Sequence, residues 1–172
     1  MSASTLKQTR SKSAGAGQQP AQRALGNVAT GKAKTGSMLF KQIVTGKPVA
    51  GFDAIATIRE GYSASMLKAA SSYFNVPDVR IQTIVRIPAS TASRLEKKLA
   101  RIDPGATERI YRMGTVTRMA IEVFENEDVA INWMRQPNRV FRNVAPLDLM
   151  DTEPGATSVR QVLNAIATGG VA

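Results

Sequence analysis

The chain has 172 residues, of which 43% are apolar, and this is enough for one ordinary domain or two small domains with a buried core. It contains no cysteine and no histidine, which excludes disulfides, thiol nucleophiles, Cys/His zinc sites and Ser-His-Asp triads. The net charge is +10, and no pair of acidic residues forms a hydrolase motif. We therefore expect no enzymatic activity, no cofactor, no metal site and no small-molecule substrate.

The positive charge is concentrated in the first part of the sequence. Residues 1–50 hold eight basic and no acidic residues, residues 51–120 hold eleven and six, and residues 121–172 hold four and seven. A basic N-terminal part and an acidic C-terminal part indicate two different partners. The basic part suits a polyanion such as DNA, and the acidic part suits a basic or neutral protein surface. Charge alone is equally compatible with an excess of lysine and arginine that serves only solubility.

Residues 1–37 are predicted to form a disordered basic arm. Ser, Ala, Gly, Gln, Lys and Thr dominate there, with few large apolar side chains to offset the entropy of ordering. Its six positive charges suit contacts with DNA phosphates that do not read sequence, although an inert tail is an equally open interpretation. No apolar run approaches the ~20 residues needed to span a bilayer, and no apolar signal core is present, so we expect a cytoplasmic protein without membrane association.

From residue 38 onward, the spacing of apolar residues predicts helices, and no segment alternates as a strand would, so an all-α fold is expected. The first helical piece is closed by Gly46 and Pro48, and a second piece stops at Gly61. Ser63 is a candidate cap of the third helix, which ends before Pro77. The apolar residues of these three pieces are Met38, Leu39, Ile43 and Val44, then Phe52, Ile55 and Ile58, and then Met66, Leu67, Ala70 and Phe74.

Residues 79–99 have the pattern of a helix-turn-helix, with a second helix predicted from Ser90 to Leu99. Such motifs place a small residue where the two helices meet, with apolar residues four before it and six after it, and Val85, Ala89 and Leu95 have this spacing. The second helix begins with short polar side chains and becomes basic, which suits insertion into a major groove. Helix pairs with a small residue at the turn also occur in other helical proteins. The predicted contacts are Ser90, Thr91, Ser93 and Arg94 to base edges or nearby phosphates, and Lys97 and Lys98 to phosphates.

Capping residues divide the remainder of the chain into helices. Asp103, Asn126 and either Asp151 or Thr152 are predicted N-caps, and Pro137 and Gly169 are predicted stops. We interpret Trp133 as a core residue. Residues beyond Gly169 are open to two interpretations, a frayed end or a functional tail. The predicted inward residues are Ile110, Met113, Val116, Ala120 and Phe124 on the first helix, and Ala156, Val159, Val162, Leu163 and Ile166 on the last.

Several of these segments resemble the Xre/MbcA/ParS-type antitoxins of bacterial toxin–antitoxin modules, over about residues 39–172. Residues 130–134 (AINWM) are similar to the family's A-x-x-W-L element, and residues 91–94 (TASR) to its T-L-x-R element, with Ala92 in place of the more usual leucine. The tail after Gly169 is shorter and less aromatic than many family tails. Further matching elements are Pro137-Asn138, Pro146-Leu147-Asp148-Leu149, Thr152-Glu153-Pro154-Gly155 and Glu108-Arg109-Ile110-Tyr111-Arg112.

The resemblance implies an Xre-like helix-turn-helix DNA-binding domain over residues 38–102 and a small helical toxin-binding domain over residues 103–172. It implies a type II system in which the partner is a RES-domain toxin that depletes NAD and whose cleft is blocked by the antitoxin's C-terminal segment. It also implies a homodimer that represses its own promoter. The alternative is a stand-alone helix-turn-helix regulator that uses the C-terminal domain for dimerisation. The toxin-binding residues implied are Arg160, Asn164, Thr168, Gly169, Gly170, Val171 and Ala172.

Overall fold

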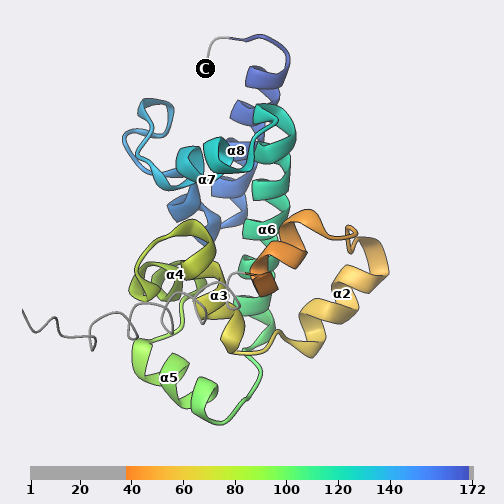
Figure 1. The fold of residues 1–172 in the computed structure, drawn as a ribbon, viewed down its shortest axis with the longest axis vertical. Helices are drawn as coiled ribbons and strands as arrows, with labels where there is room; N and C mark the ends of the chain where they lie inside the picture. Colours follow the sequence, from red (N-terminus) through yellow and green to blue (C-terminus); the bar gives the residue numbers. More distant parts are fainter. Residues whose placement is uncertain (1–37, 171–172) are drawn as a thin grey trace, which may run out of the picture.

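The longest helix, α6 (Pro104–Phe124), lies at the centre of the molecule, and the other helices pack around it (Figure 1). The computed structural model describes residues 38–170, so the predictions made for residues 1–37 and for Val171 and Ala172 lie outside the described residues. Within the described part, all regular structure is helical apart from two isolated bridges, and the predicted all-α fold is confirmed. In addition to a helix over residues 38–45, the elements are α2 (Gly51–Glu60), α3 (Ser65–Phe74), α4 (Asp78–Val85), α5 (Ala89–Lys97), α6, α7 (Glu127–Arg135), η1 (Arg139–Phe141), η2 (Pro146–Asp151) and α8 (Glu153–Ala167).

Helix α6 begins where the sequence predicts it. The Asp103 side chain accepts a hydrogen bond from the backbone N of Ala106 at 3.0 Å, and Pro104 occupies the first turn. The inward stripe is buried from Ile110 to Ala120, whereas Phe124 is half-buried at the helix end. Gly114 is buried on this helix and faces residues 38–45, where a Cβ would collide with the side chain of Ile43. Only glycine therefore allows the two helices to approach this closely.

Residues 38–45 form the predicted helix, but its inward face differs from the prediction. Phe40 and Val44 are buried, while Met38 and Leu39 are exposed. Phe40 packs against the rings of Tyr73 and Phe74, with ring centroids 5.1 and 5.3 Å away. The prediction omitted Phe40 because the spacing of Met38, Leu39, Ile43 and Val44 already formed a plausible helical face. Three aromatic rings thus join this helix to α3.

Helices α2 and α3 confirm the predicted elements, with two corrections. On α2 the apolar residues Phe52 and Ile55 are exposed, Ala54 is the buried residue, and Ile58 is half-buried. On α3 the N-cap position is Ala64 and makes no side-chain cap bond. The predicted cap, Ser63, lies one residue earlier in an isolated bridge with Arg101.

Helices α7 and α8 begin with side-chain caps. Asn126 Oδ1 accepts a hydrogen bond from the backbone N of Val129 at 3.1 Å, and Thr152 Oγ1 accepts one from the backbone N of Gly155 at 3.2 Å. Thr152, not Asp151, therefore caps α8. A Cβ on Gly155 would meet the backbone oxygen of Leu149, so glycine lets the start of α8 fold back onto η2. Trp133 is half-buried and packs against the core through Phe124 and Phe141.

Candidate functional site

The helix-turn-helix consists of α4 and α5, joined by Arg86, Ile87 and Pro88. Arg86 adopts a left-handed conformation with φ 61°, and Ile87 is buried beneath the turn. Helix α5 begins one residue earlier and ends two residues earlier than predicted. As a result Ala89 is exposed, and Ala92 is the small residue buried between the helices. The predicted packing role of Ala89 is therefore wrong, while Val85 is buried and Leu95 is half-buried as the motif requires.

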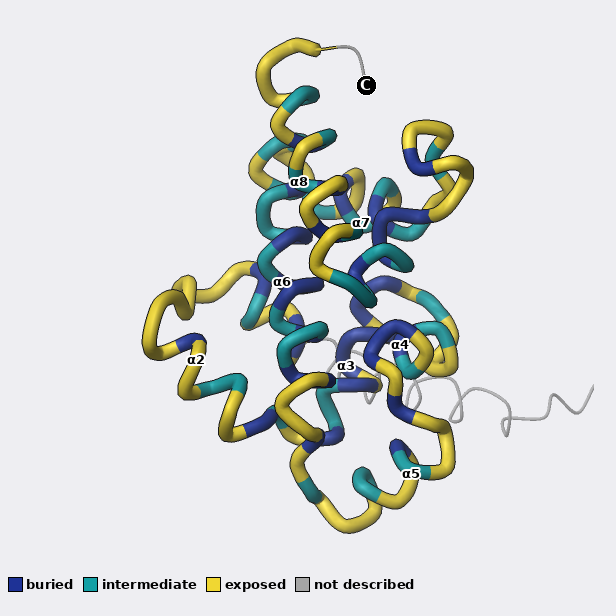
Figure 2. Tube along the Cα trace, turned by 180° about the vertical axis from the view of Figure 1, so that it is seen from behind, coloured by how far each residue is buried: buried dark blue, intermediate teal, exposed yellow. Residues whose placement is uncertain are grey.

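The residues predicted to contact DNA lie together on α5 and directly after it. Thr91 is half-buried, and the other five predicted contacts are exposed. Figure 2 shows that α5 is largely exposed along its length. Among residues 38–170, no carboxylate lies within ion-pair distance of Arg94, Lys97 or Lys98. On the side facing α3, by contrast, Glu96 is paired with Lys68 at 3.0 Å. Helix α5 therefore presents uncompensated positive charge to solvent, as a phosphate-binding surface requires.

Arginines on α4 and α6 connect the helix-turn-helix to the C-terminal elements. Arg80 on α4 donates to both carboxylate oxygens of Asp148 on η2, at 2.7 and 2.9 Å, and to the backbone oxygen of Arg135 at 3.1 Å. Arg109 on α6 donates to the backbone oxygens of Val85 and Asp151, both at 3.3 Å. These contacts fix the first helix of the motif against η2.

Arg112 is the most deeply buried charged residue of this junction. Its side chain is 9% exposed, and it donates to the backbone oxygen of Met150 at 3.1 Å and to both carboxylate oxygens of Glu108. It also lies 3.1 Å from Glu153, which is paired with Arg160 at 2.7 Å. The hydrogen bond from Arg160, aided by the charge of Arg112, lowers the pKa of the Glu153 carboxyl below its ordinary value. Sequence reasoning did not identify Arg80 or these pairings, although Glu108, Arg112 and Asp148 lie in the segments that carry the family resemblance.

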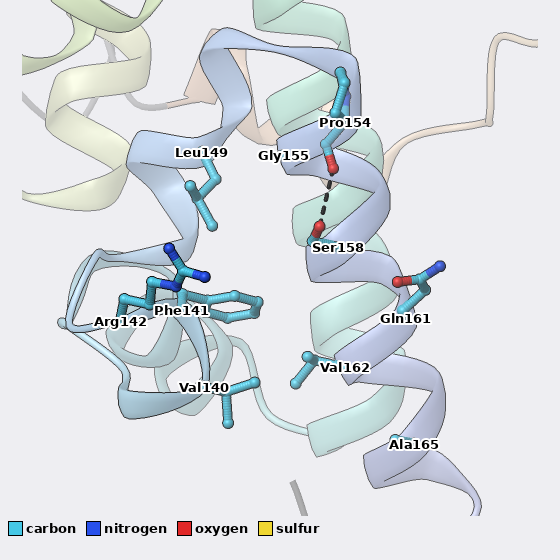
Figure 3. Close-up of a pocket in the computed structure, with 10 residues that line it drawn as sticks. All are labelled: Val140, Phe141, Arg142, Leu149, Pro154, Gly155, Ser158, Gln161, Val162 and Ala165. Atoms are coloured by element: carbon cyan, nitrogen blue, oxygen red, sulfur yellow. Dashed lines mark hydrogen bonds between the residues drawn. The ribbon is translucent and has the colours of Figure 1, made fainter.

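A groove separates η1 from α8 at the C-terminal end of the molecule (Figure 3). Its volume is about 740 Å³, and its lining is mainly apolar, with Arg142 on one side. Sequence reasoning missed this groove because η1 is too short to show a helical period. The lining residues are Val140, Phe141, Arg142, Leu149, Pro154, Gly155, Ser158, Gln161, Val162 and Ala165.

The described residues of the predicted toxin-binding set lie along α8 and just after it. Arg160, Asn164 and Thr168 are spaced by four residues and so share one side of the helix. Arg160 is half-buried through its pair with Glu153, whereas Asn164, Thr168, Gly169 and Gly170 are exposed. Gly169 has φ 76° and Gly170 N donates to the backbone oxygen of Ala165 at 2.8 Å, which closes the helix as predicted. The side of α8 next to this row lines the groove.

Within residues 38–170, no cluster of three or more Asp or Glu side chains could hold a metal ion. None of the described helices has both the length and the apolar character needed to cross a membrane.

Comparison with known families identifies two domains in the chain. Residues 53–113 match the antitoxin Xre-like helix-turn-helix domain, and residues 119–169 match the antitoxin Xre/MbcA/ParS C-terminal toxin-binding domain. The chain is similar to proteins named Antitoxin Xre from Yersinia enterocolitica, at 26% identity over 67% of this chain and 78% of the relative, and from Pseudomonas putida, at 27% identity over 69% and 73%. It is also similar to the Prs ADP-ribosylating antitoxin of a Sphingobium species, at 26% identity over 77% of this chain and 87% of the relative.

A helix-turn-helix with an exposed basic helix, followed by a helical domain that binds a protein, defines a DNA-binding regulator with a protein partner. The chain belongs to the Xre/MbcA/ParS-type antitoxins of toxin–antitoxin systems. Its partners are accordingly a toxin and DNA, and the family is one of antitoxins and DNA-binding regulators that typically lack catalytic activity.

Proposed function

We propose that this antitoxin neutralises a RES-domain toxin that degrades NAD, by covering the active site of the toxin with α8 and the tail that follows it. The observation that supports this is the exposure of the outer side of α8 up to its last turn. Ala156, Val159 and Leu163 anchor the helix to the core, while Asn164, Thr168 and Gly169 remain exposed beyond this anchor. At the end of the molecule α8 extends past its neighbours (Figure 1). A partner can therefore enclose this end without disturbing the fold.

The tail supplies the group that enters the toxin's cleft in this proposal. Gly169 and Gly170 carry no side chains and permit close backbone approach, so the following residues, Val171 and Ala172, occupy the cleft. Arg160, Asn164 and Thr168 then contact the rim of the cleft.

An NAD-consuming toxin also fits the name of the Sphingobium relative. ADP-ribosylation transfers the ADP-ribose part of NAD to another molecule, so hydrolysis of NAD and ADP-ribosylation start from the same bound cofactor. A tail that occupies the NAD cleft would block either reaction. The proposed block of the NAD cleft therefore holds whether the toxin hydrolyses NAD or transfers ADP-ribose from it.

The second part of the proposal is that the antitoxin, as a homodimer, represses its own promoter. Residues 38–102 form the DNA-binding domain in this division and residues 103–172 the toxin-binding domain. In this proposal Ser90, Thr91, Ser93 and Arg94 lie toward the bases, and Lys97 and Lys98 contact phosphates. The exposure of all of these residues except the half-buried Thr91 supports it. Occupation of the promoter by the antitoxin would then limit its own synthesis and that of the toxin.

Co-expression with the neighbouring open reading frame tests the toxin part. Three versions are compared, the full chain, a chain ending at Thr168, and a full-length control with Arg94→Ala and Lys97→Ala, and growth and cellular NAD are measured. We expect the full chain and the α5 control to preserve growth and NAD, and the shortened chain to fail while retaining its helical circular dichroism. Protection by the shortened chain would overturn the tail mechanism, and a neighbour that is harmless alone would favour the stand-alone regulator.

A further inference from the structure

Helix α8 has three sides, and only one of them packs into the core. At 3.6 residues per turn these sides lie roughly 120° apart, and Gln161 lies at the border between the second and the third. A partner that encloses the projecting end of α8 on its second side therefore reaches the third side as well. The sides are the core side with Ala156, Val159 and Leu163, the row of Arg160, Asn164 and Thr168, and the groove side with Pro154, Ser158, Val162 and Ala165.

We infer that the groove between η1 and α8 holds the toxin, by taking up an apolar side chain of the toxin next to an acidic one that pairs with Arg142. This rests on the toxin neutralisation in the proposed function and adds a second contact with a different task. The groove holds the toxin, and the tail blocks its active site. The family match supports the choice of occupant, because every residue that lines the groove falls within residues 119–169, which match the toxin-binding domain.

The wall of the groove on the η1 side is fixed by its own hydrogen bonds. Asn138 Oδ1 accepts a hydrogen bond from the backbone N of Val140 at 3.0 Å, and the backbone N of Asn143 donates to the backbone oxygen of Asn138 at 2.9 Å. Arg142 and Asn143 are both left-handed, with φ of 56° and 63°, a conformation that is uncommon for residues other than glycine. A wall that already has its shape binds a partner without a further cost of ordering.

The interior of the groove offers apolar surface to a side chain from another protein. Figure 3 shows Val140, Phe141 and Leu149 on one side and α8 with Val162 and Ala165 on the other. Val140 is 48% exposed. The volume of about 740 Å³ lies within the range of binding pockets, roughly 300–1,000 Å³. Because the groove is open to solvent, it suits a side chain carried by another protein better than a small molecule, which favours a site that encloses it.

The charge beside the groove is positive. Arg142 lines the groove, Arg139 lies on the same turn, and both are exposed. Within residues 38–170 no carboxylate lies within ion-pair distance of either arginine, and no acidic residue lines the groove. An acidic residue of the toxin at this position would therefore gain an ion pair without having to displace a partner within the described part of the antitoxin.

Hydrogen exchange on the natural complex tests the location of the contact. The full chain is co-expressed with the neighbouring open reading frame, and the purified complex is compared with the antitoxin alone. We expect slower amide exchange in the complex over residues 139–143 and 158–165, and unchanged exchange over residues 89–97 of α5, which serve as the control. Unchanged exchange over residues 139–143 would overturn the inference.

Competition between antitoxin chains tests the chemistry of the groove. Tagged toxin is purified with labelled natural antitoxin, and the concentration of an unlabelled chain that replaces half of the label is measured. Val140→Asp with Arg142→Glu should raise this concentration about ten-fold or more, with unchanged circular dichroism. Val129→Asp on α7 is the matched control, because Val129 is 49% exposed, and it should compete like the natural chain. Arg142→Lys keeps the charge and should lose less than Arg142→Glu. Equal competition by the double variant and the control would overturn the inference.

A chain ending at Thr168 separates holding the toxin from blocking it. We expect this chain to compete within about three-fold of the full chain, although it fails to preserve cellular NAD. If it does not compete while the groove variant competes fully, the tail alone holds the toxin and the inference is overturned. If the neighbouring protein binds through the groove but degrades no NAD, the groove contact is supported and the proposed function is overturned. A neighbour that does not bind the full chain would overturn both.

Discussion

Arg80 and Asp148 lie 68 residues apart in the sequence and form a bidentate ion pair, with Nε and Nη2 of the arginine 2.7 and 2.9 Å from the two carboxylate oxygens. The pair joins α4 of the helix-turn-helix to η2, which directly precedes α8. This ion pair is therefore one of the contacts that connect the helix-turn-helix to the C-terminal elements, in addition to the shared apolar core.

Removing this pair is predicted to destabilise the whole described fold. Arg80→Ala should lower the free energy of unfolding by about 1.5–3 kcal/mol, because Asp148 no longer accepts hydrogen bonds from a charged partner at this partly buried position. Urea denaturation followed by circular dichroism measures the change. Arg86→Ala is the matched control, since Arg86 is 57% exposed and lies 3.3 Å from Asp151, and it should cost less than about 1 kcal/mol. Equal losses in the two variants would contradict the role of the Arg80 contact.

The effect of Gly114→Ala on the free energy of unfolding is predicted to depend on the residue at position 43. Gly114→Ala should cost about 1–3 kcal/mol in the natural protein, because the added methyl group collides with Ile43. In an Ile43→Ala background the same change should become neutral or stabilising, because the Cγ2 atom with which the methyl group collides is gone and alanine is favoured over glycine in a helix by about 1 kcal/mol. A double-mutant cycle from urea denaturation measures this coupling. Additive effects would show that the two residues do not meet.

Glu153 contributes a dependence of stability on pH. Its pKa is lowered in the folded state from an ordinary 4.5, mainly by the hydrogen bond from Arg160, so its contribution is present above pH 4.5 and is lost as the pH falls through the lower folded value. Glu153→Gln should therefore lower the urea midpoint at pH 7, and the difference from the natural protein should shrink below pH 4.5. Glu122→Gln on α6, whose side chain makes no ion pair among the described residues, is the control and should show no such convergence.

The basic residues of α5 predict a change in the salt dependence of DNA binding. With a labelled fragment of its own promoter, Arg94→Ala with Lys97→Ala should weaken binding and reduce the slope of log K against log salt by about 2, close to one unit for each phosphate that the variant no longer neutralises. Fluorescence anisotropy over a salt series measures the slope. Arg139→Ala, on η1 at the other end of the molecule, should leave it unchanged. An unaltered slope in the α5 variant would place the phosphate contacts elsewhere.

The starts of three helices could be predicted from the sequence, because an N-cap depends only on a side chain and on a backbone N–H three residues later. Asp103, Asn126 and Thr152 each cap a helix through a backbone N–H three residues later, and the three residues lie at the positions where the pattern places helix starts. The prediction of Trp133 as a core residue is also confirmed, although it packs at the edge between Phe124 and Phe141.

Features that depend on the tertiary arrangement could not be predicted. Apolar spacing on α2 shows that Phe52 and Ile55 share a side, but only the position of α6 determines that this side faces outward. A shift of one residue in the start of α5 exchanges the roles of Ala89 and Ala92. The groove beside α8 also depends on η1, whose position follows from distant packing. The sequence motifs quoted for the family cover Asp148 but give no indication that Arg80 is its partner.

Ala92 is the one fully buried residue of α5, Leu95 packs half-buried against the core, and most of the remaining residues of this helix face solvent. Almost every other residue of α5 can therefore be exchanged without creating a cavity or leaving a buried group unpaired. If α5 reads bases as proposed, a few surface mutations can change the recognised DNA sequence while the packing of the C-terminal elements stays the same.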